Sequence, residues 1–302
     1  MTHFDILVPG NYFCDMIFTG FPQFPALGTE VYTQNLTVTV GGVLNTVIGL
    51  SRLGVHVGWL GQIGTDFFSR FVLETIAAEG IDDSLLVRRD APCQRVTVAV
   101  SFPADRAFVS YVDAADSSVK LMLDAFDRLS FRHLHFTGFQ LDPRTPELLR
   151  AARARGATVS MDCQDRPITL ESPMVLEVLT QLDIFMPNAL EAQRLTETTT
   201  LQDAAARLRP YVPLLVIKDG AQGAHTWQGD QHEFVPAISV QPVDTTGAGD
   251  VFNAGFLTAL REGKALLDCL RWGNICGGLS TLGHGGTTTA PTRAQVEMRF
   301  GG

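Results

Sequence analysis

Short apolar runs that end in Gly, Asp or Asn alternate with helical stretches along most of this chain, and this alternation limits its possible folds more than any other feature. The runs cover residues 4–8, 55–63, 133–138, 157–162, 184–188 and 214–220. Strands that alternate with helices form parallel sheets, because each helix crosses over and covers a face of the sheet. The sequence therefore predicts an α/β fold with a mostly parallel central sheet.

Two further segments have a different pattern. Residues 31–40 and 95–112 mix Val and aromatic residues with polar ones and alternate in part, which is typical of half-buried strands with one face available. The 302 residues contain no internal repeat, low-complexity tract or long Pro/Ser linker. We therefore expect one domain over 1–302, with a small β insertion.

Composition and charge exclude several classes of protein. Apolar residues make up 45% and charged residues 18%, as in globular chains, and the net charge of −9 has the wrong sign for gripping nucleic acid or an anionic membrane. The five cysteines are scattered without a Cys-x-x-Cys pair, and the first residues lack a basic region followed by an apolar run. We expect a cytoplasmic protein without disulfides, signal peptide or membrane span.

Polar residues that close the apolar runs are the first candidates for a site, because ligands of open α/β sheets bind at the carboxyl ends of the strands. Asp15, Asp162, Asn188, Lys218 and Asp219 stand at such positions. His133 and His135 lie within one run, and we expect them to be a core and a surface histidine and not metal ligands.

The strongest motif is Asp-Thr-Thr-Gly-Ala-Gly-Asp at residues 244–250, followed by an apolar helix expected over 251–260. Glycines that open a helix expose backbone N–H groups to an anion, and the helix dipole adds attraction for phosphate. Asp250 lies beside that pocket, where we expect it to stay ionised at neutral pH and to accept a proton from an alcohol. Phosphoryl transfer to a hydroxyl needs this combination. Gly-Ala-Gly alone would favour a tight turn, with Asp250 as an N-terminal helix charge; the full motif favours the phosphate site.

This motif resembles the C-terminal signature D-T-x-G-A-G-D of the ribokinase-like (PfkB) carbohydrate kinases. Residues 40–46 are similar to the family's glycine motif, and Asn188-Ala189-Leu190-Glu191 to its N-x-x-E motif. The resemblance covers nearly the whole chain. It implies a ribokinase-like three-layer α/β/α fold, with a small β-strand lid formed by segments around 16–40 and 95–112.

The resemblance also implies roles for the motif residues. Asp250 is the expected base, and Gly247, Ala248 and Gly249 form the expected anion hole. Asn188 and Glu191 would organise Mg²⁺ and the phosphates of ATP through water, although N-x-x-E is also an ordinary helix cap. The strand–turn with Lys218, Gly220 and Gly223 would line the nucleotide, as would Asn274 in a helix expected over 265–282.

On the substrate side, the resemblance implies that Asp15, Gly41, Gly42 and Asn45 bind sugar hydroxyls. Val40 departs from the family pattern, because a glycine is expected there. Residues 162–166 are similar to a D-x-N-x-R stretch in which Gln164 replaces Asn, so Arg166 is a candidate substrate ligand or a solvated arginine. Asp244 and Thr246 are candidates for a K⁺ site, or they only fix the turn.

The leading interpretation is an ATP- and Mg²⁺-dependent kinase that phosphorylates a primary hydroxyl of a small unphosphorylated sugar, and works as a homodimer through its lid. A nucleoside kinase on the same scaffold is the alternative, with an apolar lid supplied by Phe13, Phe18, Phe21, Phe24, Phe102 and Phe108. A catalytically silent sugar sensor is a third interpretation, which the retained Asp250 disfavours. A sugar phosphate is a poor substrate candidate because Val43 stands where a basic residue would receive the second phosphate.

Overall fold

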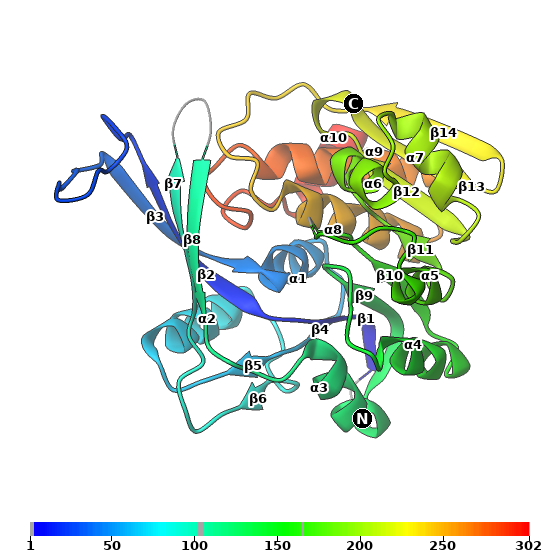
Figure 1. The fold of residues 1–302 in the computed structure, drawn as a ribbon, viewed down its shortest axis with the longest axis horizontal. Helices are drawn as coiled ribbons and strands as arrows, with labels where there is room; N and C mark the ends of the chain where they lie inside the picture. Colours follow the sequence, from blue (N-terminus) through cyan, green and yellow to red (C-terminus); the bar gives the residue numbers. More distant parts are fainter. Residues whose placement is uncertain (1–2, 102–105, 165, 302) are drawn as a thin grey trace.

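The central sheet of the computed structural model crosses the whole molecule, and the structure describes residues 3–101, 106–164 and 166–301. Among these residues the strand order is β14-β13-β12-β11-β10-β9-β1-β4 (Figure 1). The bounds are β1 His3–Pro9, β4 Val57–Leu60, β9 Ser130–Phe136, β10 Thr158–Met161, β11 Ile184–Phe185, β12 Leu214–Lys218, β13 Gly223–Gln228 and β14 Gln231–Pro236. From β12 to β4 the pairing is parallel, and β13 and β14 extend one edge antiparallel.

Helices cover both faces of this sheet and give three layers. One face carries α1 Val43–Arg52, α2 Phe67–Ala78, α8 Ala248–Arg261, α9 Leu266–Ser280 and α10 Arg293–Phe300. The other face carries α3 Ser118–Ala125, α4 Thr145–Ala154, α5 Pro173–Leu179, α6 Ala189–Thr196 and α7 Leu201–Leu208. Each face has its own hydrophobic core, as expected for a parallel sheet that is buried on both sides. The predicted three-layer α/β/α class is confirmed.

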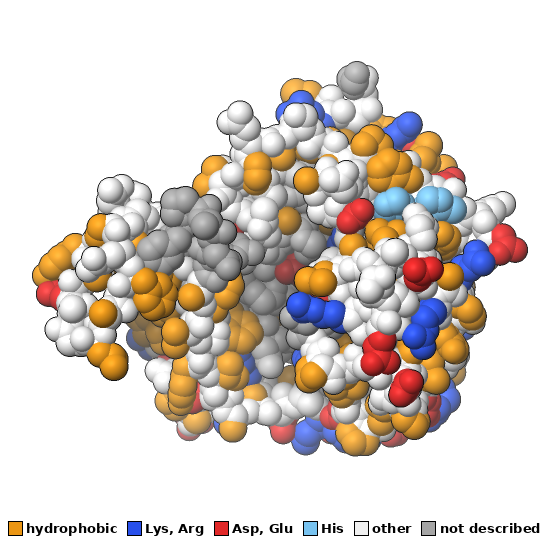
Figure 2. All heavy atoms as spheres, turned by 45° about the horizontal axis from the view of Figure 1, so that its top comes forward, with side chains coloured by type: hydrophobic (Ala, Val, Ile, Leu, Met, Phe, Trp, Pro, Cys, Tyr) orange, Lys and Arg blue, Asp and Glu red, His pale blue; other side chains and the backbone are white. Residues whose placement is uncertain are grey.

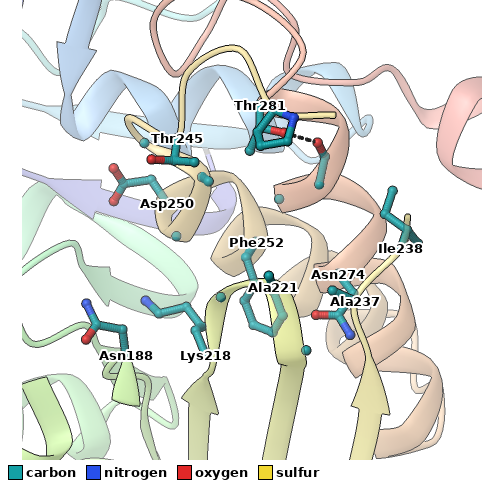
Figure 3. A pocket seen from close by; sticks show the side chains of 18 of the residues that line it. Asn188, Lys218, Ala221, Ala237, Ile238, Thr245, Asp250, Phe252, Asn274 and Thr281 are labelled. Atoms are coloured by element: carbon teal, nitrogen blue, oxygen red, sulfur yellow. Dashed lines mark hydrogen bonds between the residues drawn. The ribbon is translucent and has the colours of Figure 1, made fainter. Parts of the chain in front are cut away.

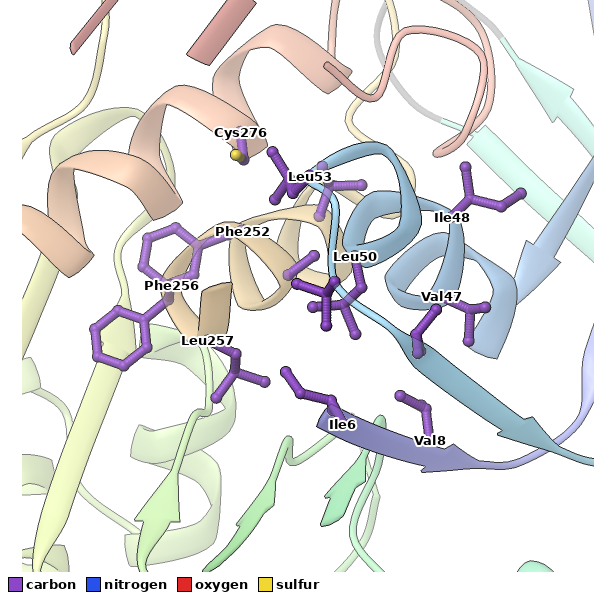
Figure 4. Packing of buried hydrophobic residues seen from close by; sticks show 14 of the residues in the cluster. Ile6, Val8, Val47, Ile48, Leu50, Leu53, Phe252, Phe256, Leu257 and Cys276 are labelled. Atoms are coloured by element: carbon purple, nitrogen blue, oxygen red, sulfur yellow. The ribbon is translucent and has the colours of Figure 1, made fainter. Parts of the chain in front are cut away.

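The close contact of α1 with α8 positions the candidate site. Figure 4 shows side chains of both helices packed over β1, with Val47 and Leu50 from α1 and Leu257 from α8. A Cβ atom on Gly49 would lie only 2.8 Å from the Cβ of Ala254, so a glycine is needed where the helices meet. The N-terminal turns of α1 and α8 lie one turn before Gly49 and Ala254, and the contact between these two residues brings the turns together.

A second sheet projects to one side of the three layers (Figure 1). Its order is β3-β2-β7-β8, with β2 Tyr12–Thr19, β3 Asn35–Gly42, β7 Arg95–Ser101 and β8 Arg106–Val112. It begins at Tyr12, earlier than the expected boundary near 16, so Asp15 lies within a strand and not in a loop. Residues 102–105 of the expected lid, Phe102 among them, lie outside the described residues. A short pair, β5 Gln62–Ile63 and β6 Val87–Arg88, lies below this sheet.

Several local expectations differ from the structure. The helix expected over 251–260 begins three residues earlier, at Ala248, because Gly247 adopts φ +71° and starts it from the left-handed region. His133 and His135 are both buried, since residues two apart on β9 share one face, and both rings contact the Ser160 hydroxyl. All five cysteines are free thiols. Within the described ranges, every helix is too short or too polar to cross a bilayer.

Candidate active site

The carboxyl ends of β10 and β12 and the N-terminus of α8 open into a cavity of about 780 Å³ (Figure 3). Ten of the residues predicted from the sequence line this cavity: Gly247, Ala248, Gly249, Asp250, Asn188, Glu191, Lys218, Gly220, Gly223 and Asn274. These residues come from four separate segments of the sequence. The structure therefore brings the predicted base, anion hole and nucleotide residues to one place.

The N-terminal turn of α8 forms the anion-binding part of this cavity. Gly247, Ala248 and Gly249 line the wall, and they precede the first intrahelical hydrogen bonds. The first N–H groups of a helix lack intrahelical partners, so they and the positive end of the helix dipole lie at the cavity, although Ala248 N–H donates to the Thr245 carbonyl at 3.3 Å. Gly247 has no room for a side chain, because a Cβ atom would lie 2.7 Å from Asn45 Nδ2.

Asp250 lies in the same turn, and α1 holds it. Asn45 Nδ2 donates a hydrogen bond of 3.1 Å to Asp250 Oδ2. Burial, followed by the negative charge of Asp162, raises the pKa of Asp250 to about 7, while Asn45 and Lys218 act in the opposite direction. This raised pKa differs from the expectation of a carboxylate that stays ionised at neutral pH. A base with a pKa near neutrality is well suited to accept a proton from an alcohol.

Lys218 lies at the floor of the cavity in a buried polar cluster. Its Nζ donates to Asp162 Oδ2 at 2.5 Å, and Asn253 Nδ2 donates to the same oxygen at 2.6 Å. A Cβ atom placed on Gly249 would lie 3.4 Å from Lys218 Nζ, so the ammonium is next to the glycine turn.

Asn188 and Glu191 form a capping box at the start of α6. The Asn188 side chain accepts from the Glu191 N–H, and Glu191 Oε2 accepts from the Asn188 N–H, both at 2.8 Å. Both residues also line the cavity. Carboxylate and amide oxygens are hard donors that suit Mg²⁺ and its waters, so this pair fits a magnesium ion.

The far end of the cavity is less polar. Ala237, Ile238 and Phe252 line it together with Asn274, whose Nδ2 donates to the carbonyls of Val235 and Pro236 (Figure 3). Gly223 adopts φ +128°, and a Cβ atom there would lie 2.1 Å from the Val235 carbonyl oxygen, so only glycine fits. This end offers a space with apolar lining beside a turn that contains Gly223.

Asp15, Gly41 and Gly42 lie on the second sheet and do not line this cavity. The register pairs Asp15 with Thr39 of β3 and Thr97 of β7. Burial, and then the charge of Asp244, raises the pKa of Asp15 to about 6. Asn45 connects this group with the cavity, because α1 follows Gly42 directly and Asn45 contacts Asp250.

Asp244 and Arg166 have surroundings that differ from those of the other predicted residues. Asp244 Oδ1 accepts from the N–H and hydroxyl of Thr246, and Oδ2 accepts from Gly285 N–H, so Asp244 fixes the turn. The K⁺ role stays a prediction. Arg166 is exposed and off the cavity wall, where it contacts Gln164, which does line the cavity. Asp165, part of the predicted motif, lies outside the described residues.

Sequence reasoning missed the partners of Lys218. It noted Asp162 as the end of an apolar run and as the first residue of the 162–166 stretch, without linking it to Lys218, and it did not single out Asn253. A signal was present, because Asn253 is a polar residue in the middle of the apolar helix that follows Asp250, and it is fully buried.

The fold and this site define a class of protein, enzymes that transfer phosphate to carbohydrates. Residues 18–293 match the family described as pfkB family carbohydrate kinase, and the chain belongs to that family. The resemblance noted in the sequence is thereby confirmed, and the chain is a sugar kinase, an ATP-dependent phosphotransferase.

Individual relatives support this assignment along the full length. A ribokinase of Bacillus subtilis (strain 168) is 29% identical over 302 residues, which cover 97% of this chain and 98% of that protein. Fructokinase-1 of Zea mays is 29% identical over 307 residues, with 94% and 95% covered. The solved ribokinase of Thermotoga maritima has the same fold, with a TM-score of 0.81 at 22% identity over 99% of this chain and 100% of that one.

Proposed function

We propose that this enzyme transfers the γ-phosphoryl group of ATP to a primary hydroxyl of a small unphosphorylated sugar, with Asp250 as the base. The observation that carries the proposal is the position of Asp250. Its carboxylate lies in the first turn of α8, held by Asn45 and adjacent to the N–H groups of the Gly247–Gly249 turn. A base and an anion hole within one helical turn are what transfer to an alcohol requires.

The reaction follows from this arrangement. The acceptor oxygen forms a bond to the γ-phosphorus while its proton moves to the Asp250 carboxylate, and the bond from that phosphorus to the β–γ bridging oxygen breaks, so ADP leaves. Negative charge on the transferred group faces the N–H groups of the Gly247–Gly249 turn. Asn188 and Glu191 would hold Mg²⁺ through water, and the ion would neutralise charge on the phosphates when bound. The space lined by Ile238, Phe252 and Asn274 suits the base of the nucleotide.

The acceptor is assigned to the second sheet, beside Asp15. Among the residues described, no hydrogen-bond donor is recorded for the Asp15 carboxylate, although Asp15 is only 9% exposed. Paired hydroxyls of a sugar would supply these donors and offset the loss of water. After burial, the negative charge of Asp244 raises the pKa of Asp15, so the two carboxylates repel each other. This repulsion supports a K⁺ ion near Asp244 as part of the same proposal.

The second sheet is proposed to act as a lid over the sugar, and closing it would exclude water from the transfer. The face of this sheet that points away from Asp15 carries exposed apolar side chains, which supports a homodimer formed through the lid. Leu36, Val38, Val109 and Tyr111 are exposed on the sheet, and Figure 2 shows hydrophobic side chains gathered over it. Exposed apolar surface of this kind is typical of contacts between subunits.

A nucleoside is the second candidate acceptor. The register places Phe108 of β8 opposite Ala99, and Ala99 beside Ile17, which is on the same face of the sheet as Asp15. An aromatic ring there would give a nucleobase an apolar surface to stack against. The sugar remains the first candidate, because the Asp15 carboxylate can accept hydrogen bonds from sugar hydroxyls whether or not the acceptor carries a nucleobase.

A panel assay of ADP release separates these acceptors. The panel holds unphosphorylated ketoses, aldoses, sugar acids and nucleosides with Mg-ATP, and we expect one sugar to turn over well above the rest. Preference for a nucleoside would replace the first candidate by the second. Binding of ATP without turnover of any compound would favour the sensor, and absence of ATP binding would contradict the kinase.

We expect substitution of Gly41 by alanine to raise the KM for the sugar by more than about 10-fold while kcat falls less. A Cβ atom at Gly41 would lie 2.0 Å from Asp15 Oδ2, so the methyl group would occupy the place of a sugar hydroxyl. Losing hydrogen bonds to a charged group costs about 1.5–3 kcal/mol each, which is the origin of that factor. Initial-rate kinetics measure both constants. Gly301→Ala, whose Cβ would meet only an ordinary contact at 3.5 Å, serves as the control and is expected to be silent.

The pH dependence should follow Asp250. We expect kcat/KM to fall about tenfold per pH unit just below neutrality, because only the ionised carboxylate accepts a proton and its pKa is raised to about 7. Below about pH 6 the fall should steepen, because Asp15 is then protonated as well. Activity is present above that pKa and lost as the pH falls through it. Rates measured with both substrates below KM from about pH 5 to 9 test this. A flat profile across that range would contradict the assignment of the base.

A further inference from the structure

Lys218 is a buried cation whose surroundings are more elaborate than a nucleotide contact requires. Its side chain is 11% exposed and that of Asp162 is 9% exposed. Lys218 Nζ lies 2.5 Å from Asp162 Oδ2 and 3.4 Å from Asn253 Oδ1, while Asn253 Nδ2 closes the triangle at 2.6 Å from the same Asp162 oxygen. Asp162 directly follows β10, Lys218 ends β12 and Asn253 lies on α8, so three separate segments meet in this cluster.

The cluster lies directly under the glycine turn. Lys218 lines the cavity, and its Nζ is 3.4 Å from the place where Gly249 would carry a Cβ atom. A lysine ammonium has three N–H donors, and the bonds to Asp162 and Asn253 use two of them. The third is left for an acceptor in the cavity.

We propose that Lys218 Nζ donates a hydrogen bond to the phosphoryl group in transfer, opposite the Gly247–Gly249 turn, and that Asp162 and Asn253 are positioning residues that hold the ammonium there. The proposal rests on the proposed function. Lys218 is then a second positively charged group at the site. It stabilises negative charge on the phosphoryl group that the N–H groups of the helix turn would otherwise stabilise alone. A flexible lysine free in a cavity would lose more side-chain entropy on binding than one already fixed by two partners.

The charges around Asp250 make the proposal testable through the pH dependence of the reaction. Asp162 from β10 and Glu191 from α6 raise the pKa of Asp250, whereas Lys218 from β12 and the Asn45 hydrogen bond from α1 lower it. The buried His135 on β9, whose pKa is lowered to about 3 partly by Lys218, stays neutral in the working range. Removing Lys218 and removing Asp162 should therefore move the acid limb of the pH profile in opposite directions.

The first test is nucleotide binding by titration calorimetry, which needs no sugar. We expect Lys218→Met to weaken Mg–AMP-PNP by about 10- to 100-fold and Mg–ADP by less than about 3-fold, because the lost charge-assisted bond is to the terminal phosphate. Equal weakening of both nucleotides, or none, would overturn the proposal. If the unaltered chain binds neither nucleotide, the proposed function fails together with this inference, whereas wild-type binding with an unselective variant overturns the inference alone.

The second test is turnover. We expect Lys218→Met and Asp162→Asn each to lower kcat by about 10- to 100-fold with the sugar KM changed less than about 2-fold. The acid limb should shift to higher pH in Lys218→Met and to lower pH in Asp162→Asn. In the double variant the limb should return near the wild-type position while kcat stays low. An unmoved limb, or shifts in the same direction, would contradict the positioning role.

Controls separate this role from a loss of folding. Asp5→Asn removes an ion pair of 2.7 Å between β1 and Arg261 of α8, away from the cavity, and is expected to leave affinity, kcat and the pH profile unchanged. The double variant Lys218→Met/Asp162→Asn leaves no uncompensated buried charge, so it should fold even where a single variant does not.

Discussion

Asp250→Asn is expected to lower kcat for sugar phosphorylation by about 10²- to 10⁴-fold, the range that a positioned general base supplies. Asparagine has nearly the same shape, and its side-chain oxygen can still accept the hydrogen bond that Asn45 donates over 3.1 Å. The fold and both substrate sites should therefore persist, and the KM values should change little. The loss reflects the missing proton acceptor alone.

Asp268→Asn is the matched control for this variant. Asp268 is the acidic residue in the first turn of α9, as Asp250 is in the first turn of α8, and it pairs with Arg271 at 2.9 Å outside the cavity. We expect it to cost at most about 1 kcal/mol of stability through the helix dipole and to leave kcat unchanged. Turnover of Asp250→Asn within a few fold of the wild type would remove Asp250 from the role of base.

Gly247→Ala is expected to lower kcat by about 10²- to 10³-fold, the effect of losing one donor of an oxyanion hole. The added methyl would lie 2.7 Å from Asn45 Nδ2 and 2.9 Å from the Cα of Gly286, so the turn must shift. That shift moves the N–H groups of the turn and pulls Asn45 away from Asp250. Steady-state kinetics with saturating ATP and sugar measure the effect.

Gly263→Ala isolates this effect from backbone strain. Gly263 has φ +73°, close to the +71° of Gly247, but open space surrounds the position of its Cβ atom. The left-handed conformation should cost each variant about 1–2 kcal/mol of stability, and Gly247→Ala should lose more because its methyl group also meets Asn45 and Gly286. Only Gly247→Ala should lose activity, and equal kinetics in the two variants would contradict the role of the turn.

The sequence predicted the class of fold because the parallel strands are buried on both faces and therefore appear as continuous apolar runs. It predicted the residues around Asp250 because the whole motif at residues 244–250, and not Gly-Ala-Gly alone, points to an anion site with an adjacent acid. Element ends were less accurate: the glycine-rich start of α8 resembles a loop until its backbone conformation is known. The sequence places Asp15 after a strand, whereas it lies within β2. The pairing of β2 with β7 joins residues about 80 apart in sequence, so no local pattern reveals it.

The charge state of Asp250 and the buried cluster under it were beyond the sequence. The pKa of Asp250 depends on burial and on Asp162, which lies 88 residues away in the chain, directly after β10. Likewise, the role of Asn253 is visible only in the fold, where its amide donates a hydrogen bond to Asp162, the carboxylate that holds Lys218. Such contacts between distant segments carry no local pattern.

Transfer of the terminal phosphate from γ-labelled ATP to a sugar, with phosphorus NMR of the product, tests the central claim most directly. The account predicts label on a primary hydroxyl of one unphosphorylated sugar, at a rate that Asp250→Asn lowers by about 10²- to 10⁴-fold. Label that appears only as inorganic phosphate, or transfer that persists at the wild-type rate in Asp250→Asn, would contradict it.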